Sequence, residues 1–139
     1  MPTEPIEIAR NEWGVVRHYE QVRTLELKWL STTREMPDDG FRRTLELLAA
    51  EGARLRPPRM LIDATEFYHE FGDGVMEWRD AQIIPRYNDA GVTKFAFLVP
   101  EGAPGTVESG GVPAVEGPAT FPTGWFASRE KADEWLASE

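Results

Sequence analysis

The acidic, histidine-bearing stretch at residues 61–78 holds the residue types that most often perform chemistry. It reads LIDATEFYHEFGDGVMEW and carries its polar groups at Asp63, Glu66, His69, Glu70 and Asp73. A zinc-protease helix needs a second His four residues after the first, but Asp73 stands at that position. The carboxylates also lack the alternating spacing of a calcium-binding loop. We therefore expect no metal and no catalytic residue in this stretch.

Other catalytic classes lack their essential residues. The chain has no Cys, which excludes thiolate nucleophiles, disulfides and Cys-based metal sites. No G-x-S-x-G nucleophile turn occurs, and GAPGTVESGG at 102–111 lacks the Lys of a phosphate-binding loop. Asp73 and Glu77 could share one helical face, but like charges at that spacing are common on an acidic protein. We expect no enzymatic activity and no cofactor.

Composition limits the partners. The 139 residues are enough for one domain, and the net charge of −9 would repel nucleic acids and anionic membrane surfaces. The beginning MPTEPIEIAR has neither the basic nor the apolar part of a secretion signal, and no apolar run could span a bilayer. With the absence of Cys, these features favour a cytoplasmic location.

Periodicity predicts the first half of the chain. Apolar and polar residues alternate at 25–29, as in a half-buried strand, and residues 13–21 resemble an antiparallel partner. A helix follows Pro37, with an apolar face at Phe41, Leu45, Leu48, Gly52 and Leu55, and it ends before RPPR at 56–59. RMLIDA at 59–64 then predicts a buried strand.

The second half continues the alternation of helix and strand. A helix is expected at about 72–91, interrupted or restarted at Pro85 and capped by Gly91. TKFAFLVP at 93–100 predicts a central strand. Five Gly and four Pro within 100–118 predict a mobile surface loop at about 101–118. An edge strand at 119–128 and a final helix complete the chain, with Ser128 as the N-cap and Ala132, Trp135 and Leu136 facing inward.

This order of elements predicts the fold class. Helices that connect apolar strands indicate right-handed β-α-β units. We therefore expect a single α/β domain over residues 1–139, with a mixed sheet of four to five strands, a parallel centre, and helices mainly on one face.

Three segments together resemble a known family. They are TLELKWLSTTREMPDDGFRRTLELL, the strand RMLIDA, and the ending WFASREKADEWLAS. They are similar to the STAS superfamily (sulphate transporter and anti-sigma-factor antagonist), especially its SpoIIAA-like branch. The resemblance implies a domain that docks on a protein partner such as a sigma-factor regulator. Related SpoIIAA-like and CRAL-TRIO-like folds are associated with apolar ligands or membranes.

The family's phosphorylation switch has no equivalent residue in this chain. Asp63 matches the Asp that ends the family's LID-type strand, but the following helix start offers Gly72, Asp73 and Gly74 instead of Ser or Thr. Thr65 lies too close to the strand. We therefore expect Asp73 to interact with a helix N-terminus, together with Glu70, while His69 faces solvent.

Aromatic residues crowd the same stretch. They either close the core or form the rim of a binding surface, because aromatic residues are enriched at such surfaces. The candidate binding residues are Thr65, Phe67, Tyr68, His69, Phe71, Asp73, Trp78 and Trp125.

Two functional hypotheses follow. The first is a non-enzymatic regulatory or protein-interaction domain that uses residues 64–75, with a protein partner or a second copy of the chain. The alternative is a module that binds a small apolar ligand or lipid in a pocket between helices and sheet, gated by the loop at 101–118.

Overall fold

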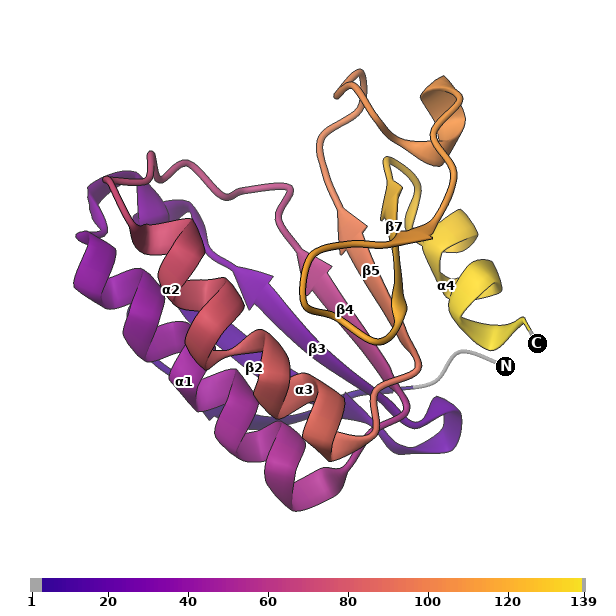
Figure 1. Ribbon diagram of the computed structural model, residues 1–139, viewed down its shortest axis with the longest axis horizontal. Helices are drawn as coiled ribbons and strands as arrows, with labels where there is room; N and C mark the ends of the chain where they lie inside the picture. The colour runs from indigo at the N-terminus through magenta and orange to yellow at the C-terminus, as the bar shows by residue number, and fades with distance from the viewer. Residues whose placement is uncertain (1–3, 139) are drawn as a thin grey trace.

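The computed structural model describes residues 4–138. In chain order the elements are β1 (Ile6–Arg10), β2 (Gly14–Tyr19), β3 (Thr24–Trp29), α1 (Asp38–Leu55), β4 (Arg59–Asp63), α2 (Val75–Gln82), α3 (Ile84–Ala90), β5 (Lys94–Leu98), β6 (Ala114–Val115), β7 (Pro122–Phe126) and α4 (Arg129–Ala137). Short 3-10 helices lie at Glu20–Val22, Ser31–Glu35 and Val107–Ser109. Figure 1 shows their arrangement.

The strands form one mixed sheet in the order β1-β2-β3-β4-β5-β7-β6. The pairs β3–β4, β4–β5 and β5–β7 are parallel, and the pairs β1–β2, β2–β3 and β6–β7 are antiparallel. The α/β class and the parallel centre are confirmed. The sheet has seven strands instead of four to five. Its two edges explain the difference: β1 is largely exposed and contains a bulge, and β6 has two residues, too few for a periodic pattern.

Local sequence explains the helix boundaries. Phe41, Leu45 and Leu48 of α1 are buried, and Arg56 ends the helix in the left-handed conformation. The expected helix at 72–91 is two helices, because Pro85 lies at the start of α3 and the turn at Ile83 interrupts the run. Gly91, with φ of 90°, caps α3 as predicted.

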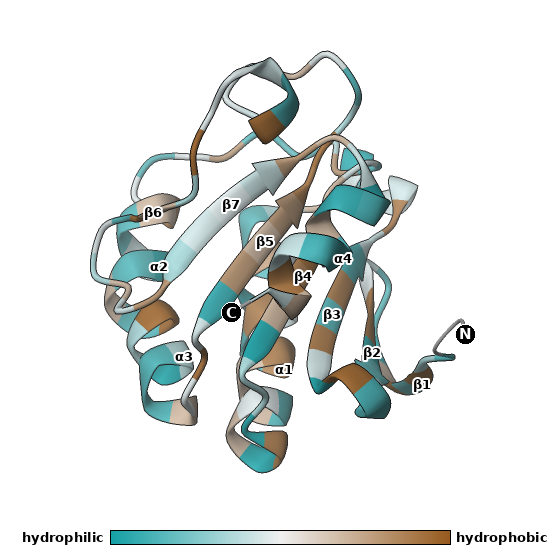
Figure 2. Ribbon diagram, turned by 90° about the vertical axis from the view of Figure 1, so that its right-hand side faces the viewer, coloured by the Kyte–Doolittle hydropathy of each residue, from teal (hydrophilic) through white to brown (hydrophobic). Residues whose placement is uncertain are grey.

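The two faces of the sheet are covered differently. Helices α1, α2 and α3 pack on one face, where Met60 and Ile62 of β4 point, and α4 packs on the other with Leu61. Figures 1 and 2 show this division. The same alternation continues along β5, where Phe95 and Phe97 face α1–α3 and their neighbours face α4.

Polar contacts hold α4 against the sheet. Ser128 caps its N-terminus by accepting a hydrogen bond from the Lys131 backbone N–H at 3.3 Å. At the other end, Arg59 Nε donates to the Leu136 carbonyl at 2.6 Å and Lys94 Nζ to the Trp135 carbonyl at 2.8 Å. Cations at these otherwise free carbonyls complement the helix dipole.

The inward residues of α4 are mostly as predicted. Ala132 and Leu136 are buried, whereas Trp135 is half-buried, with its ring against Phe126 at 5.6 Å between centroids. The strand before it, β7, is not the sheet edge that the sequence predicts, because β6 pairs with it at Val115 and Pro122.

The connection from β5 to β7 differs from the two parallel connections before it. β3 joins β4 through α1, and β4 joins β5 through α2 and α3. Residues 99–121, by contrast, contain a single 3-10 turn and the two-residue β6. In Figure 1 this segment crosses in front of β5 and β7. The α1–α3 face therefore has no helix over its β5–β7 end, and this is where the cavity lies.

Candidate ligand cavity

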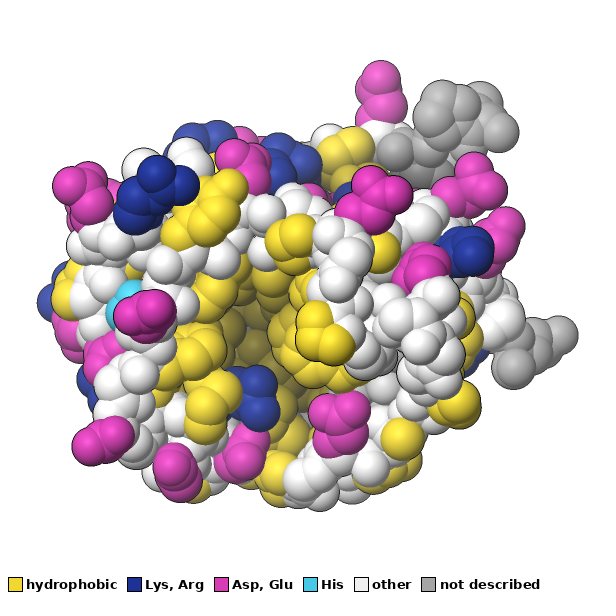
Figure 3. Space-filling model, turned by 90° about the horizontal axis from the view of Figure 1, so that it is seen from above, with side chains coloured by type: hydrophobic (Ala, Val, Ile, Leu, Met, Phe, Trp, Pro, Cys, Tyr) yellow, Lys and Arg dark blue, Asp and Glu magenta, His cyan; other side chains and the backbone are white. Residues whose placement is uncertain are grey.

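A cavity of about 630 Å³ lies between α1–α3, the sheet and the 99–121 segment. Its walls include Ile62 of β4 and Val99 and Pro100, which directly follow β5, so it lies near the carboxyl ends of the parallel strands. Figure 3 shows a deep hollow lined by hydrophobic side chains, with charged groups at its margin. Open α/β sheets commonly bind their ligands at this end, and the volume suits a small organic molecule.

Aromatic side chains make up much of the wall. Nine aromatic residues line the cavity, from a chain that has seven Phe, five Trp and three Tyr. The nine are Trp29, Phe41, Phe67, Phe71, Tyr87, Phe95, Phe97, Phe121 and Trp125. Such a surface favours an apolar ligand, since burial of apolar area contributes roughly 25 cal/mol per Å².

Two stacked pairs of rings, from β5, β7 and Phe121, form one wall of the cavity. Phe97 and Trp125 stack at 4.1 Å with 9° between their planes, and Phe95 and Phe121 stack at 5.6 Å with 17°. The indole Nε1 of Trp125 donates to Glu116 Oε2 at 3.3 Å, which joins the wall to the segment above it. Phe95 and Phe97 are tilted by 49° to each other, so the wall is aromatic without being flat, and its indole N–H already has an acceptor.

The opposite wall packs its rings edge to face. Phe67 meets Trp29 at 4.9 Å and 64°, and Phe71 meets Phe41 at 4.8 Å and 72°. The contact with Phe41 packs residues 64–74 against the N-terminal end of α1. Phe71 is 43% exposed and stands at the margin of the cavity.

The 99–121 segment is tied down near its middle and near its carboxyl end. Asn88 of α3 donates through Nδ2 to the Pro118 carbonyl at 3.0 Å, and its Oδ1 accepts from the Thr120 backbone N–H at 2.9 Å. Glu108 accepts from the backbone N–H groups of Ala127 and Ser128 at 2.9 and 3.2 Å. The Ala127 hydrogen bond is the main reason that the pKa of Glu108 lies below its ordinary value.

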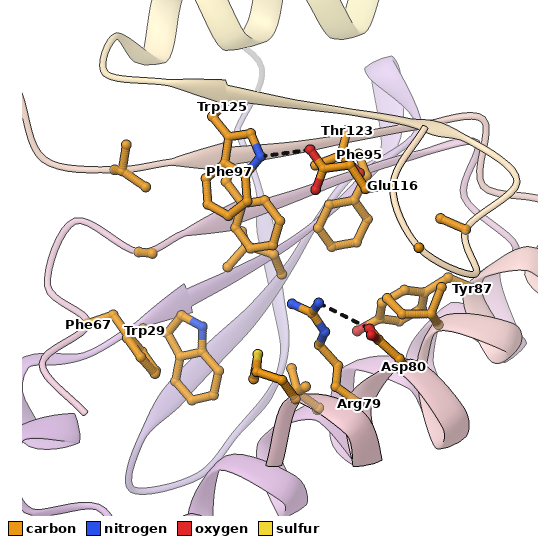
Figure 4. Close-up of a pocket in the computed structure, with 18 of the residues that line it drawn as sticks. Trp29, Phe67, Arg79, Asp80, Tyr87, Phe95, Phe97, Glu116, Thr123 and Trp125 are labelled. Atoms are coloured by element: carbon orange, nitrogen blue, oxygen red, sulfur yellow. Dashed lines mark hydrogen bonds and ion pairs between the residues drawn. The ribbon is translucent and has the colours of Figure 1, made fainter. Parts of the chain in front are cut away.

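Three charged residues are among those that line the cavity: Arg79, Asp80 and Glu116. Figure 4 shows Arg79 extending from α2 toward the aromatic wall, with Asp80 beside it and Glu116 near Trp125. Tyr87 lies nearby on α3, and burial raises the pKa of its hydroxyl, so this group is neutral at physiological pH. Arg79 is the single cation among the lining residues.

The predicted binding residues are divided by the structure. Phe67, Phe71 and Trp125 line the cavity. Thr65 instead forms a turn in which its backbone N–H and hydroxyl donate to Asp63 Oδ1, at 3.1 and 2.7 Å. Tyr68 stacks under Arg34, whose guanidinium carbon lies 4.5 Å from the ring centroid.

Trp78 does not line the cavity either. It packs against the main core from α2, with the Arg42 guanidinium 5.9 Å from its ring centroid. Three of the eight candidate binding residues therefore line the cavity, and all three are aromatic.

The prediction that His69 faces solvent was wrong. The His69 side chain is 8% exposed instead of solvent-facing, and its Nε2 lies 2.7 Å from Asp38 Oδ1. Asp38 also accepts from the Gly72 backbone N–H at 3.2 Å. α2 begins after Gly74 and no side chain caps it by a hydrogen bond, so the interaction of Asp73 and Glu70 with the helix N-terminus stays a prediction. The carboxylate that binds both His69 and the Gly72 backbone is that of Asp38 in α1, 31 residues before His69.

Several cavity residues were not predicted as binding residues. Arg79 and Tyr87 look like ordinary residues of a surface helix, and Phe95 and Phe97 look like core residues of a central strand. The available signal was the combination of two aromatic residues on one face of TKFAFLVP with a following connection that lacks helical periodicity.

Two negative findings apply to residues 4–138. No helix there is both long and apolar enough to cross a membrane. Nowhere in this range do three or more His, Asp or Glu side chains gather in a way that could hold a metal ion. Comparisons with protein-family models, with curated proteins and with solved structures found no match.

Proposed function

We propose that this domain binds an apolar small molecule in the aromatic cavity. The observation that carries the proposal is the cavity itself, about 630 Å³ bounded by nine aromatic residues and three charged ones. A domain of this size ordinarily fills such a space with side chains, because interiors are close-packed. The sequence raises this function as the alternative to protein docking, and the cavity now makes it the better-supported hypothesis.

The 99–121 segment would act as the ligand's cover. It crosses the open end of the α1–α3 face and contributes Pro100, Ala103 and Ala119 to the wall. Its tethers at Asn88 and Glu108 are a few hydrogen bonds, many of them exposed, instead of a packed helix. The part of the cover at 101–118 can move while Ala119 and Phe121 stay in the core, which allows a ligand to enter.

A titration with a neutral fluorescent probe tests the function. N-phenyl-1-naphthylamine is apolar and uncharged, and it brightens when it leaves water. We expect saturable binding at one site per chain. Met76 of α2 lines the cavity, so Met76→Trp should fill part of it and weaken binding at least about tenfold. Ile6→Trp adds the same ring at an exposed position on the far edge strand and should leave binding unchanged.

Two results would overturn the proposal. One is the absence of saturable binding to the unmodified protein. The other is equal affinity in Met76→Trp, provided that its circular dichroism shows a folded domain, because the probe would then bind elsewhere.

Docking of a protein remains a second candidate, favoured by one observation. Tyr68 and Phe71 are each 43% exposed and lie close in sequence, and Phe71 also lines the cavity. We infer that a SpoIIAA-like domain without the phosphorylatable Ser could present this pair to a partner, including a second copy of the chain. Sedimentation of the unmodified protein and of Tyr68→Ser/Phe71→Ser tests the second copy: a concentration-dependent dimer that the double variant loses would support it.

A further inference from the structure

Arg79 is placed where an apolar cavity has no need of a cation. Its side chain extends from α2 toward Phe97 and Phe95, and the guanidinium points into the space between the two walls (Figure 4). The side chain is 31% exposed and lines the cavity, so most of its surface is removed from solvent. A charged group in such surroundings is costly unless hydrogen bonds and an opposite charge compensate it.

The compensation that Arg79 receives within the chain is incomplete. One Nη donates to Asp80 Oδ1 at 3.1 Å, but Asp80 is the next residue on the helix and is 43% exposed. Consecutive helical residues do not face each other, and exposed ion pairs contribute little. The Nε–H of Arg79 is buried and has no acceptor among the described residues. A guanidinium with an unused donor therefore borders the cavity.

The other ionisable groups in the lining point to the same conclusion about the ligand's polar end. Tyr87 is held neutral by burial and does not supply a negative charge. Glu116 lies by the β7 wall, where its carboxylate accepts the Trp125 indole N–H. Asp80 also lines the cavity and occupies one Nη of Arg79, so an anionic group would be attracted to the remaining N–H donors of Arg79 and repelled from Glu116. The anionic end of a ligand is therefore expected near Arg79 and away from Glu116.

We propose that the ligand is a monocarboxylic acid with an apolar, planar body, and that Arg79 binds its carboxylate. This rests on the proposed ligand-binding function of the same cavity. A carboxylate can accept two parallel N–H donors from a guanidinium, and such charge-assisted bonds are stronger than neutral ones. The planar body of the ligand then packs against the aromatic wall that contains the Phe97–Trp125 stack, as one further ring beside that stack.

The net charge of the protein makes this a demanding prediction. At −9 the surface as a whole repels anions, so any preference for an acid over its neutral analogue must arise locally. The competing explanation is that Arg79 merely extends its charged end from an apolar surface toward water. That explanation predicts no preference for an acid.

Displacement of the neutral probe separates these explanations. The competitors are 2-naphthoic acid, its uncharged analogue 2-naphthamide, and decanoic acid, which has a carboxylate on a flexible chain. With the unmodified protein we expect 2-naphthoate to displace the probe at a concentration about tenfold or more below that of 2-naphthamide. Arg79→Met keeps an unbranched apolar side chain and should abolish this preference; acid and amide are compared within each variant, so a change in probe affinity does not affect the comparison.

A matched variant controls for net charge. Arg86→Met removes a cation from α3, where Arg86 pairs with Glu46 and does not line the cavity. It should leave the preference for the acid intact.

Each outcome decides a different claim. If the neutral probe fails to bind the unmodified protein, the proposed function fails and this inference fails with it. If the probe binds but acid and amide compete equally, or Arg79→Met and Arg86→Met behave alike, the function stands and the carboxylate inference is overturned. If decanoate competes better than 2-naphthoate, the carboxylate stands and the planar body is wrong.

Discussion

The two faces of the sheet are closed by different means. On the α4 face a small core around Leu61, Leu98 and Phe126 is completed by one short helix that polar contacts hold at both ends. The α1–α3 face has the larger core, yet it keeps a cavity of about 630 Å³. The difference follows from the connections: the β5–β7 crossover passes over the α1–α3 face without a helix. A face with more apolar residues can therefore be the one that is less completely packed.

Deleting one aromatic ring from each face should expose the difference most clearly. Phe126 is 2% exposed and packs under α4, so Phe126→Ala should lower the free energy of unfolding by about 3 to 5 kcal/mol. Phe97 borders the existing cavity on one side, so Phe97→Ala should cost only about 1 to 2 kcal/mol. Urea denaturation followed by circular dichroism measures both. Equal losses would mean that the α1–α3 face is as tightly packed in solution as the other.

The buried charge on the α4 face gives the next largest effect. Glu26 is 0% exposed, its Oε1 accepts from Arg129 at 2.9 Å, and Arg17 lies 3.7 Å from its Oε2. Arg129→Met would leave this carboxylate buried without its main partner, at a cost of about 3 kcal/mol. Glu26→Gln should cost less, about 1 to 2 kcal/mol, because Arg129 is 36% exposed and can reach water.

The double variant makes this test specific. Arg129→Met with Glu26→Gln should be more stable than Arg129→Met alone, since no unpaired charge then remains. Arg43→Met, which removes an exposed cation paired with Asp39, should change stability by less than about 0.5 kcal/mol. If the double variant is the least stable of the set, then α4 is not held by this ion pair.

The two faces should also differ in the mobility of their connections, which amide hydrogen exchange measures. Backbone amides in 101–118 should exchange with solvent fastest among the internal segments, because Gly and Pro provide few regular hydrogen bonds. Amides of β4 and β5, which pair on both sides, should exchange slowest. Mass spectrometry after deuterium labelling reports this order. Protection of 101–118 equal to that of β5 would contradict it.

Local sequence was sufficient to predict most of the regular structure. The apolar face of α1, the break before Pro85, the cap at Gly91 and the Ser128 cap each depend on residues within one or two turns. Such features are readable because propensity, periodicity and capping act over short distances. The prediction of four to five strands failed at the edges, where β1 and β6 are held by pairing and have little burial of their own.

The cavity could not be predicted in the same way. It depends on where residues 99–121 run, and this path is set by contacts with Asn88, Ala127 and Ser128 from other elements. Phe95 and Phe97 look like core residues because they are apolar and central in the sheet. Nothing in their own strand shows that the surface they face is incompletely covered. Likewise, the partner of His69 lies on another helix, so the pattern at 61–78 could not reveal it.

The last and smallest effect concerns pH at the cavity margin. The hydrogen bond from His69, followed by that from the Gly72 backbone N–H, holds the pKa of Asp38 below its ordinary value of 3.8. Because the folded-state pKa is the lower one, the carboxylate stabilises the fold above about pH 4, and this contribution is lost as the pH falls through the folded value. Arg42 adds a weaker favourable charge. Asp38→Asn should therefore be less stable than the unmodified protein near neutral pH, and the difference should shrink below about pH 4. Urea midpoints for both proteins across this range measure it, with Asp89→Asn, at an exposed residue of α3, as a control for charge.

Because Asp38 ties the segment that carries Phe71, the loss should also weaken binding of the neutral probe, while the environment of Trp135 on the α4 face stays unchanged. A stability difference that is constant with pH would show that the charge of Asp38 does not contribute. Residues 64–74 would then be held by their aromatic contacts.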